Sequence, residues 1–164
     1  MKIVAFPFID MYQSPIGKLV IKATQHHIHQ IYFDDDFTGP VNKSAITKQA
    51  THQLTEYFNG KLQHFDLPIK QEGTEFMHEV WNKLTTTNYG ETISYLTLAE
   101  KMGNPQMVRA VANANGKNQL AIVVPCHRVI GTNGKLTGYA WGLNRKSWLI
   151  DFEQKISGKK LSLF

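Results

Sequence analysis

The spacing of apolar residues along this 164-residue chain changes once, close to residue 73, and this change limits the folds that the chain can adopt. Ahead of it, short runs of β-branched and aromatic residues alternate with turn-forming residues, which predicts strands over residues 8–12, 18–24, 28–33 and 64–69. Apolar residues at helical spacing over 44–58, closed by Asn59-Gly60, predict a single helix. We therefore expect a small antiparallel sheet with one covering helix.

After residue 73 the apolar period is that of helices, which are predicted over residues 76–84, 94–103 and 106–113. Asn104-Pro105 separates the last two, because Asn is a favoured N-cap and Pro a favoured first helical residue. Two short helices joined by such a turn predict a helix-turn-helix, although helical hairpins that bind no nucleic acid use the same turns. With a linker over 71–74, the predicted domains are residues 1–73 and 74–164.

The formal net charge of +5 is unevenly distributed. Residues 1–75 carry seven Lys and eight acidic residues, whereas residues 76–164 carry eleven basic and five acidic residues. This excess of positive charge indicates a polyanionic partner such as nucleic acid for the C-terminal part, with a solvated surface as the alternative.

Composition excludes several classes of protein. The 42% of apolar residues can form a packed core, and no run approaches the roughly 18 apolar residues of a membrane span. The single cysteine cannot form an intramolecular disulfide or a multi-cysteine zinc site. Because no signal-like apolar stretch opens the chain, we expect a soluble protein of the reducing cytoplasm.

That cysteine, Cys126, has the most informative surroundings in the chain. The apolar run 122–124 leads to Pro125, whose ring fixes the backbone approach, and His127 and Arg128 follow directly. Neighbouring positive charge favours the thiolate, which is the nucleophilic form, so this pattern indicates covalent catalysis. The alternative is a buried structural cysteine.

The pentapeptide 125–129, Pro-Cys-His-Arg-Val, is the signature of the methylated-DNA–protein-cysteine methyltransferases, or O6-alkylguanine-DNA alkyltransferases. The chain resembles that family over most of its length, with further matches at Ser94, Tyr95, 103–105, 109–111, Asn118, Gly138, Tyr139, Lys146, Trp148, Leu149 and Glu153. The resemblance implies an α/β (α+β) fold: a ribonuclease-H-like N-terminal sheet with its helix, then a mainly helical domain with a winged-helix-like helix-turn-helix.

The resemblance also implies an activity, which is DNA repair by direct damage reversal. The alkyl group, usually methyl, would pass from O6 of guanine or O4 of thymine in double-stranded DNA to Cys126, once per molecule and without a cofactor. A monomer is expected. No metal is expected, because the zinc-binding cysteines of some relatives are missing and His26, His27 and His29 lack a familiar ligand spacing.

Catalytic roles follow by position in the family's motifs. His127 would take the thiol proton through a water, Glu153 would orient His127, and Asn118 would bridge the turn ahead of the site. Tyr95 would crowd the 3′ phosphate and assist the flipped base, while Arg109 would fill the gap left in the duplex. The other residues expected to contact DNA in the minor groove are Ala110, Ser94 and Arg128.

The resemblance places the flipped base in a pocket read largely by backbone groups. The carbonyls of Cys126 and Val129 would accept from the guanine amine, and the amide of Ala140 would donate to O6. Tyr139 would either donate a hydrogen bond or pack against the ring. Trp141 stands where many members have glycine and should narrow the pocket, so that small alkyl groups are favoured. Asn113 and Asn115 stand where other members have glycine and an apolar residue against the base.

Three other functions compete with this prediction. An alkyltransferase-like damage sensor would keep the base-flipping apparatus but lacks the active cysteine. A helix-turn-helix transcription regulator would depend strongly on DNA sequence, whereas a repair protein should bind any duplex weakly and in a salt-dependent manner. A Cys/His hydrolase would need an oxyanion hole and a substrate cleft, for which the sequence has no motif.

Overall fold

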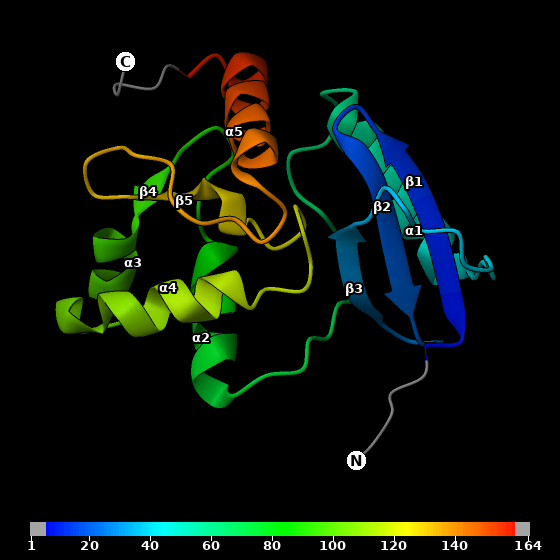
Figure 1. The fold of residues 1–164 in the computed structure, drawn as a ribbon, viewed down its shortest axis with the longest axis horizontal. Helices are drawn as coiled ribbons and strands as arrows, with labels where there is room; N and C mark the ends of the chain where they lie inside the picture. The colour runs from blue at the N-terminus through cyan, green and yellow to red at the C-terminus, as the bar shows by residue number, and fades with distance from the viewer. Residues whose placement is uncertain (1–5, 160–164) are drawn as a thin grey trace. The chain divides into compact units, whose positions relative to one another are not determined.

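The computed structural model describes residues 6–159, in which the chain forms two compact units (Figure 1). Of the described residues, the first unit contains 6–72 together with Gln119–Ala121. The second unit contains Gly73–Asn118 and residues 122–159. The spacing of apolar residues in the sequence does not indicate that Gln119–Ala121 belong to the first unit.

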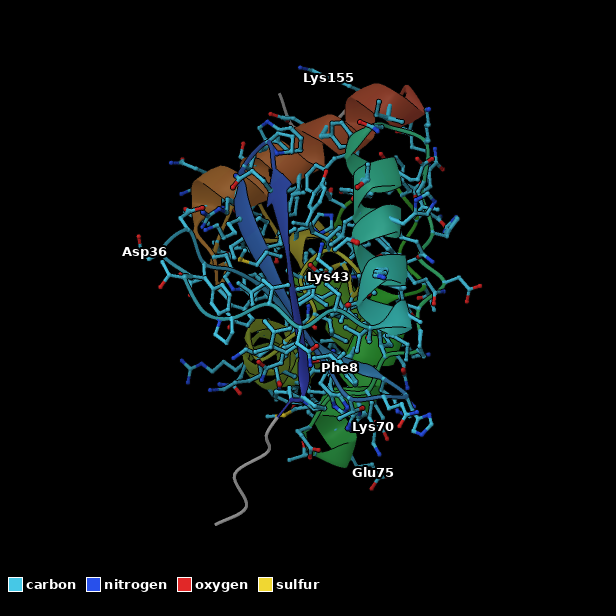
Figure 2. All side chains as sticks on the ribbon, turned by 90° about the vertical axis from the view of Figure 1, so that its right-hand side faces the viewer. Phe8, Asp36, Lys43, Lys70, Glu75 and Lys155 are labelled. Atoms are coloured by element: carbon cyan, nitrogen blue, oxygen red, sulfur yellow. The ribbon has the colours of Figure 1, made fainter. Side chains whose placement is uncertain are left out.

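The first unit is an antiparallel sheet of β1 (Phe8–Ser14), β2 (Gly17–Ala23) and β3 (Ile28–Phe33), in that order. Helix α1 (Ala45–Phe58) lies against the sheet (Figures 1 and 2). Ser44 caps this helix by accepting a hydrogen bond from the Thr47 backbone N–H, with Thr47 bonding back in return. Three of the predicted strands and the predicted helix are thus confirmed, and their apolar side chains form the core of the unit.

The predicted strand over 64–69 is wrong. Its backbone instead bonds to the side chain of Gln53, which donates to the Asp66 carbonyl at 2.8 Å and accepts from the Asp66 N–H at 2.9 Å. Only Ile69 pairs with the sheet, in an isolated bridge to Ile28. None of residues 64–69 is buried, and side chains of helix α1 take the place that a neighbouring strand would have.

In the second unit, helix α2 (Glu75–Leu84) packs with α3 (Tyr95–Lys101) and α4 (Val108–Gly116). The turn between α3 and α4 contains Gly103, at φ +94°, and a short 3₁₀ helix η1 (Pro105–Met107). Asn104 caps η1 through its side chain, as its sequence position predicted. The helix-turn-helix is confirmed, although its second helix starts later and ends later than predicted.

Three further elements complete the second unit. The 3₁₀ turn η2 (Cys126–Arg128) leads into β5 (Val129–Ile130), which pairs in parallel with β4 (Ile93–Ser94). Helix α5 (Leu143–Ser157) follows. Among the described residues, no helix has the length and apolar character needed to cross a membrane.

Candidate functional site

Cys126 opens the turn η2 and is 3% exposed. The side-chain amide of Asn118 donates to the Cys126 sulfur at 3.2 Å and to the Val124 carbonyl at 2.9 Å. One amide group therefore fixes both the nucleophile and the backbone that leads to it.

The thiol is not ionised by its neighbours in the way that the sequence indicated. Burial raises the pKa of Cys126 to about 11, against the opposing effects of the Asn118 hydrogen bond and the positive charge of Lys146. Arg128 does not offset the burial, because its guanidinium is bonded to Glu153 instead. Cys126 is therefore a thiol at neutral pH and needs a base.

His127 directly follows Cys126 and is fully buried. Its Nε2 lies 2.8 Å from Oε2 of Glu153. Burial lowers the pKa of His127, against the attraction of Glu153, so the ring is neutral. In the tautomer that donates from Nε2 to the carboxylate, Nδ1 is the free acceptor, and it has no hydrogen-bond partner among the described residues.

Glu153 also binds Arg128, through Nε at 2.8 Å and Nη2 at 3.2 Å. Burial alone would raise the pKa of Glu153, but the hydrogen bonds donated by His127 and Arg128, together with the charge of Arg128, hold it well below its usual range. Glu153 is therefore a carboxylate at neutral pH, and it fixes the orientation of the imidazole.

Arg128 does not have the surface position that a DNA contact would need. The residue is 6% exposed, its Nη1 donates to the Thr87 carbonyl at 2.9 Å, and the Tyr89 ring lies 5.6 Å from its guanidinium carbon. A DNA contact of Arg128 would have to break three buried hydrogen bonds, and it stays a prediction. No pattern in the sequence indicates that Thr87 and Tyr89 contact this side chain.

A pocket of about 260 Å³ opens onto the cysteine, and this volume lies just below the usual size range of small-molecule sites. Among its walls are four residues predicted for the site besides the nucleophile: Tyr95, Asn115, Tyr139 and Ala140. The remaining lining residues are small, and they are Ala112, Gly116 and Gly138. The pocket therefore has room for one planar group next to the sulfur.

Trp141 is not among the lining residues. Its ring meets the Tyr139 ring edge-on, with centroids 5.3 Å apart. The narrowing expected of Trp141 would therefore act through a wall residue, Tyr139, and it stays a prediction. Val129 is fully buried in β5, and Asn115 donates to the Cys126 carbonyl at 3.4 Å.

Lys146 is a site residue for which the sequence analysis predicted no role. It is fully buried, and its ammonium donates to the carbonyls of Thr137 at 2.8 Å and Gly138 at 3.1 Å. Burial lowers its pKa to about 8. The helical spacing of the sequence could have indicated this burial. Lys146 and Glu153 lie seven residues apart, so they occupy one face of α5 together with Leu149 and Ile150.

The residues expected to contact DNA lie mainly on α3 and α4. Arg109 and Ala110 are exposed near the start of α4. Tyr95 is the first residue of α3, and its hydroxyl donates to the Thr137 carbonyl at 3.4 Å. The Ser94 hydroxyl caps α3 by accepting from the Thr97 N–H at 2.9 Å. The structure thus joins Tyr95 to the pocket and leaves Arg109 and Ala110 outside the catalytic cluster.

Two family models match this chain. The model of the 6-O-methylguanine DNA methyltransferase DNA-binding domain matches residues 75–155, and the model of its ribonuclease-like domain matches residues 8–71. The chain belongs to the 6-O-methylguanine DNA methyltransferase family. Every residue predicted for catalysis, DNA binding or base binding falls within the first of these two matches.

Curated relatives in this family include the methylated-DNA–protein-cysteine methyltransferases of Mycobacterium bovis and Methanosarcina acetivorans. The first is 50% identical over 156 residues, covering 92% of this chain and 94% of the relative. The second is 41% identical over 152 residues, covering 89% and 97%.

Among solved structures, Mycobacterium tuberculosis O6-methylguanine methyltransferase superposes with a TM-score of 0.81 at 38% identity, covering 96% of this chain and 99% of that one. Mycobacterium tuberculosis OGT in complex with DNA superposes with a TM-score of 0.83 at 40% identity, covering 91% and 94%. These likenesses confirm the α/β fold class expected from the sequence.

Within residues 6–159, no three His, Cys, Asp or Glu side chains gather in a way that could hold a metal ion. His27 and His29 contact each other edge-on, with ring centroids 6.1 Å apart.

Proposed function

We propose that this protein is a methylated-DNA–protein-cysteine methyltransferase that repairs double-stranded DNA by moving the alkyl group of O6-methylguanine, or of O4-methylthymine, onto Cys126. One observation carries the proposal: the cysteine lies in a base-sized pocket, bonded to Asn118, beside a buried histidine whose Nε2 is paired with Glu153. This is the nucleophile, base and orienting group of covalent catalysis.

In the proposed reaction, His127 Nδ1 takes the thiol proton through a water molecule while Glu153 stabilises the imidazolium that forms. The sulfur then attacks the methyl carbon, so that a carbon–sulfur bond forms as the carbon–O6 bond breaks. The departing guanine gains a proton at N1 and becomes ordinary guanine. The product S-methylcysteine is a stable thioether, so each molecule reacts once.

The target atom is out of reach inside a stacked duplex, so the base must be flipped out. Support for the DNA-binding roles comes from the exposure of Arg109 and Ala110 on α4 and from the place of Tyr95 at the pocket. The base contacts of Val129 and Ala140 belong to the same proposal, as do the domain boundary after residue 73, the monomeric state and the cytoplasmic location.

The test is the intact mass of the protein after incubation with a duplex that contains O6-methylguanine. We expect the mass of one methyl group to be added per molecule, and no addition to Cys126→Ser. A damage sensor would bind the duplex without a mass change, and a transcription regulator would show strong dependence on base sequence. Continued turnover beyond one equivalent would contradict single use.

A further inference from the structure

The chain between Asn118 and Cys126 does not stay within the second unit. Asn118 and Ile122 belong to the second unit, but Gln119–Ala121 between them belongs to the first. The two ends of this segment form the nucleophile site, because the Asn118 amide donates to the Cys126 sulfur. The first unit therefore holds the middle of the loop whose ends carry the chemistry.

Backbone hydrogen bonds tie this middle part to the sheet. The Ile31 N–H donates to the Gln119 carbonyl at 2.9 Å, and the Ala121 N–H donates to the Ile31 carbonyl at 2.9 Å. Leu120 between them is fully buried and forms a parallel bridge with Ile31. Gln119–Ala121 is thus held as if it were a short extra strand beside β3.

A side chain completes the attachment. The Gln71 carboxamide oxygen accepts from the Gln119 N–H at 2.8 Å, and the Gln71 residue is 8% exposed. The Gln119 side chain in turn donates to the Glu72 carbonyl at 3.0 Å. Both the N–H and the carbonyl of Gln119 are therefore fixed, and this residue directly follows Asn118 in the chain.

The next residue of the loop gives an independent sign of constraint. Ile122 has a φ of +71° and is 2% exposed, and within residues 6–159 it is the one residue other than glycine with a positive φ. A β-branched residue is strongly disfavoured there, and such a conformation persists only where its surroundings enforce it. The loop is therefore held from outside rather than by its own preference.

We infer that the first unit positions the nucleophile by clamping Gln119–Ala121, and that Gln71 is a positioning residue for methyl transfer. This inference rests on the proposed function. Without the Gln71 acceptor, the backbone after Asn118 gains freedom, and the Asn118 amide no longer holds the Cys126 sulfur in place. The bond between Gln71 and Gln119 lies within the first unit, whereas α3 and α4 belong to the second, so transfer should slow while DNA affinity is retained.

The experiment measures single-turnover methyl transfer against duplex concentration, which separates the maximal rate from the concentration at half-maximal rate. Gln71→Met removes the acceptor at similar size, whereas Gln71→Glu keeps an acceptor oxygen. Gln53→Met is the matched control, since Gln53 also bonds to backbone groups of the first unit but at Asp66, away from the clamp.

We expect Gln71→Met to lower the maximal rate about 10- to 100-fold, as small misplacements of reacting groups do, while the half-maximal concentration stays within about twofold. Gln71→Glu should recover most of the rate, and Gln53→Met should stay within about twofold of the wild type. Equal maximal rates for Gln71→Met and Gln53→Met would overturn the inference.

Amide hydrogen exchange supplies a readout that does not depend on the reaction. The Cys126 N–H donates to the Val124 carbonyl at 2.8 Å, and Gln71→Met should speed its exchange about tenfold, without a change in α3. Unchanged exchange at Cys126 would overturn the clamp. A wild type that folds but transfers no methyl group would overturn the proposed function. Hydrogen exchange at the Cys126 N–H would still show whether Gln71 restrains the loop. If Gln71→Met does not fold, Gln71→Asn, which withdraws the acceptor by one methylene, must slow transfer for the inference to stand.

Discussion

Replacing Arg128 with methionine tests whether this side chain stabilises a buried carboxylate or binds DNA. The side chains of Arg128 and Glu153 are 7% and 2% exposed, so solvent screens their interaction little. Removing one partner of such a pair leaves the other charge buried and costs about 3–5 kcal/mol. Because His127 stays bonded to the carboxylate, we expect a loss of about 3 kcal/mol, or about 6–12 °C in Tm for a chain of this size.

The assay is urea unfolding of the wild type and of Arg128→Met, together with duplex binding over a range of salt concentrations. Arg109→Met is the matched control, because Arg109 is exposed on α4. Its loss should change stability by no more than about 0.5 kcal/mol but reduce the salt dependence of binding by about one charge. Arg128→Met should do the reverse, lowering stability and leaving the salt dependence unchanged.

The opposite result would refute the reasoning. If Arg128→Met unfolds at the urea concentration of the wild type and loses salt dependence, then Arg128 contacts phosphate in the complex. The buried ion pair would in that case be a feature of the DNA-free protein only.

Three other predictions concern the same unit. Because burial raises the pKa of Cys126 from 9.0 to about 11, the unfolded chain releases the thiol proton at a lower pH than the folded chain. Between about pH 9 and 11, the free energy of unfolding measured in urea should therefore fall by about 2–3 kcal/mol more for the wild type than for Cys126→Ser. Equal pH dependence in the two proteins would contradict this. Gly90 has a φ of +82° and an added Cβ there would clash with Ser157, whereas Gly103, at φ +94°, faces open space. In thermal unfolding, Gly90→Ala should therefore lose clearly more stability than Gly103→Ala, for which a loss of about 1–2 kcal/mol is expected. Equal losses would count against close packing of Gly90 on Ser157. Trp141→Ala should free the Tyr139 ring, which Trp141 contacts edge-on. Intact mass should then show that adduct formation with a benzyl substrate becomes faster relative to a methyl substrate. An unchanged ratio of the two rates would show that Trp141 does not limit the size of the pocket.

Local sequence was sufficient for much of the fold. The runs at β1, β2 and β3 differ from their neighbours in period and are bounded by turn residues, and Asn104 caps the helical turn that follows it, as expected. The segment 64–69 was misjudged because its partners are the side chains of Gln49 and Gln53, which lie on a helix. Such an exchange of partners leaves no periodic trace in the sequence.

The site was predictable where a motif fixes it and less so where the contacts are distant. His127 and Glu153 are 26 residues apart, and only the resemblance to a known family could pair them. The ion pair that buries Arg128 has no such signal, since an arginine next to a catalytic cysteine equally suits a thiolate or a phosphate. Burial, which the sequence does not show, decides between these roles.

Lys146 and Glu153 stand two helical turns apart on α5, which is about 10 Å along a rigid rod. Lys146, near the start of the helix, donates to the Thr137 and Gly138 carbonyls beside the pocket. Glu153, two turns later, binds the imidazole of His127 and orients it. The shape of the cavity and the direction of proton transfer are therefore mechanically linked. A one-residue insertion between them would rotate one group by about 100° relative to the other and uncouple the two, whereas a change that shifts the whole rod would alter both together.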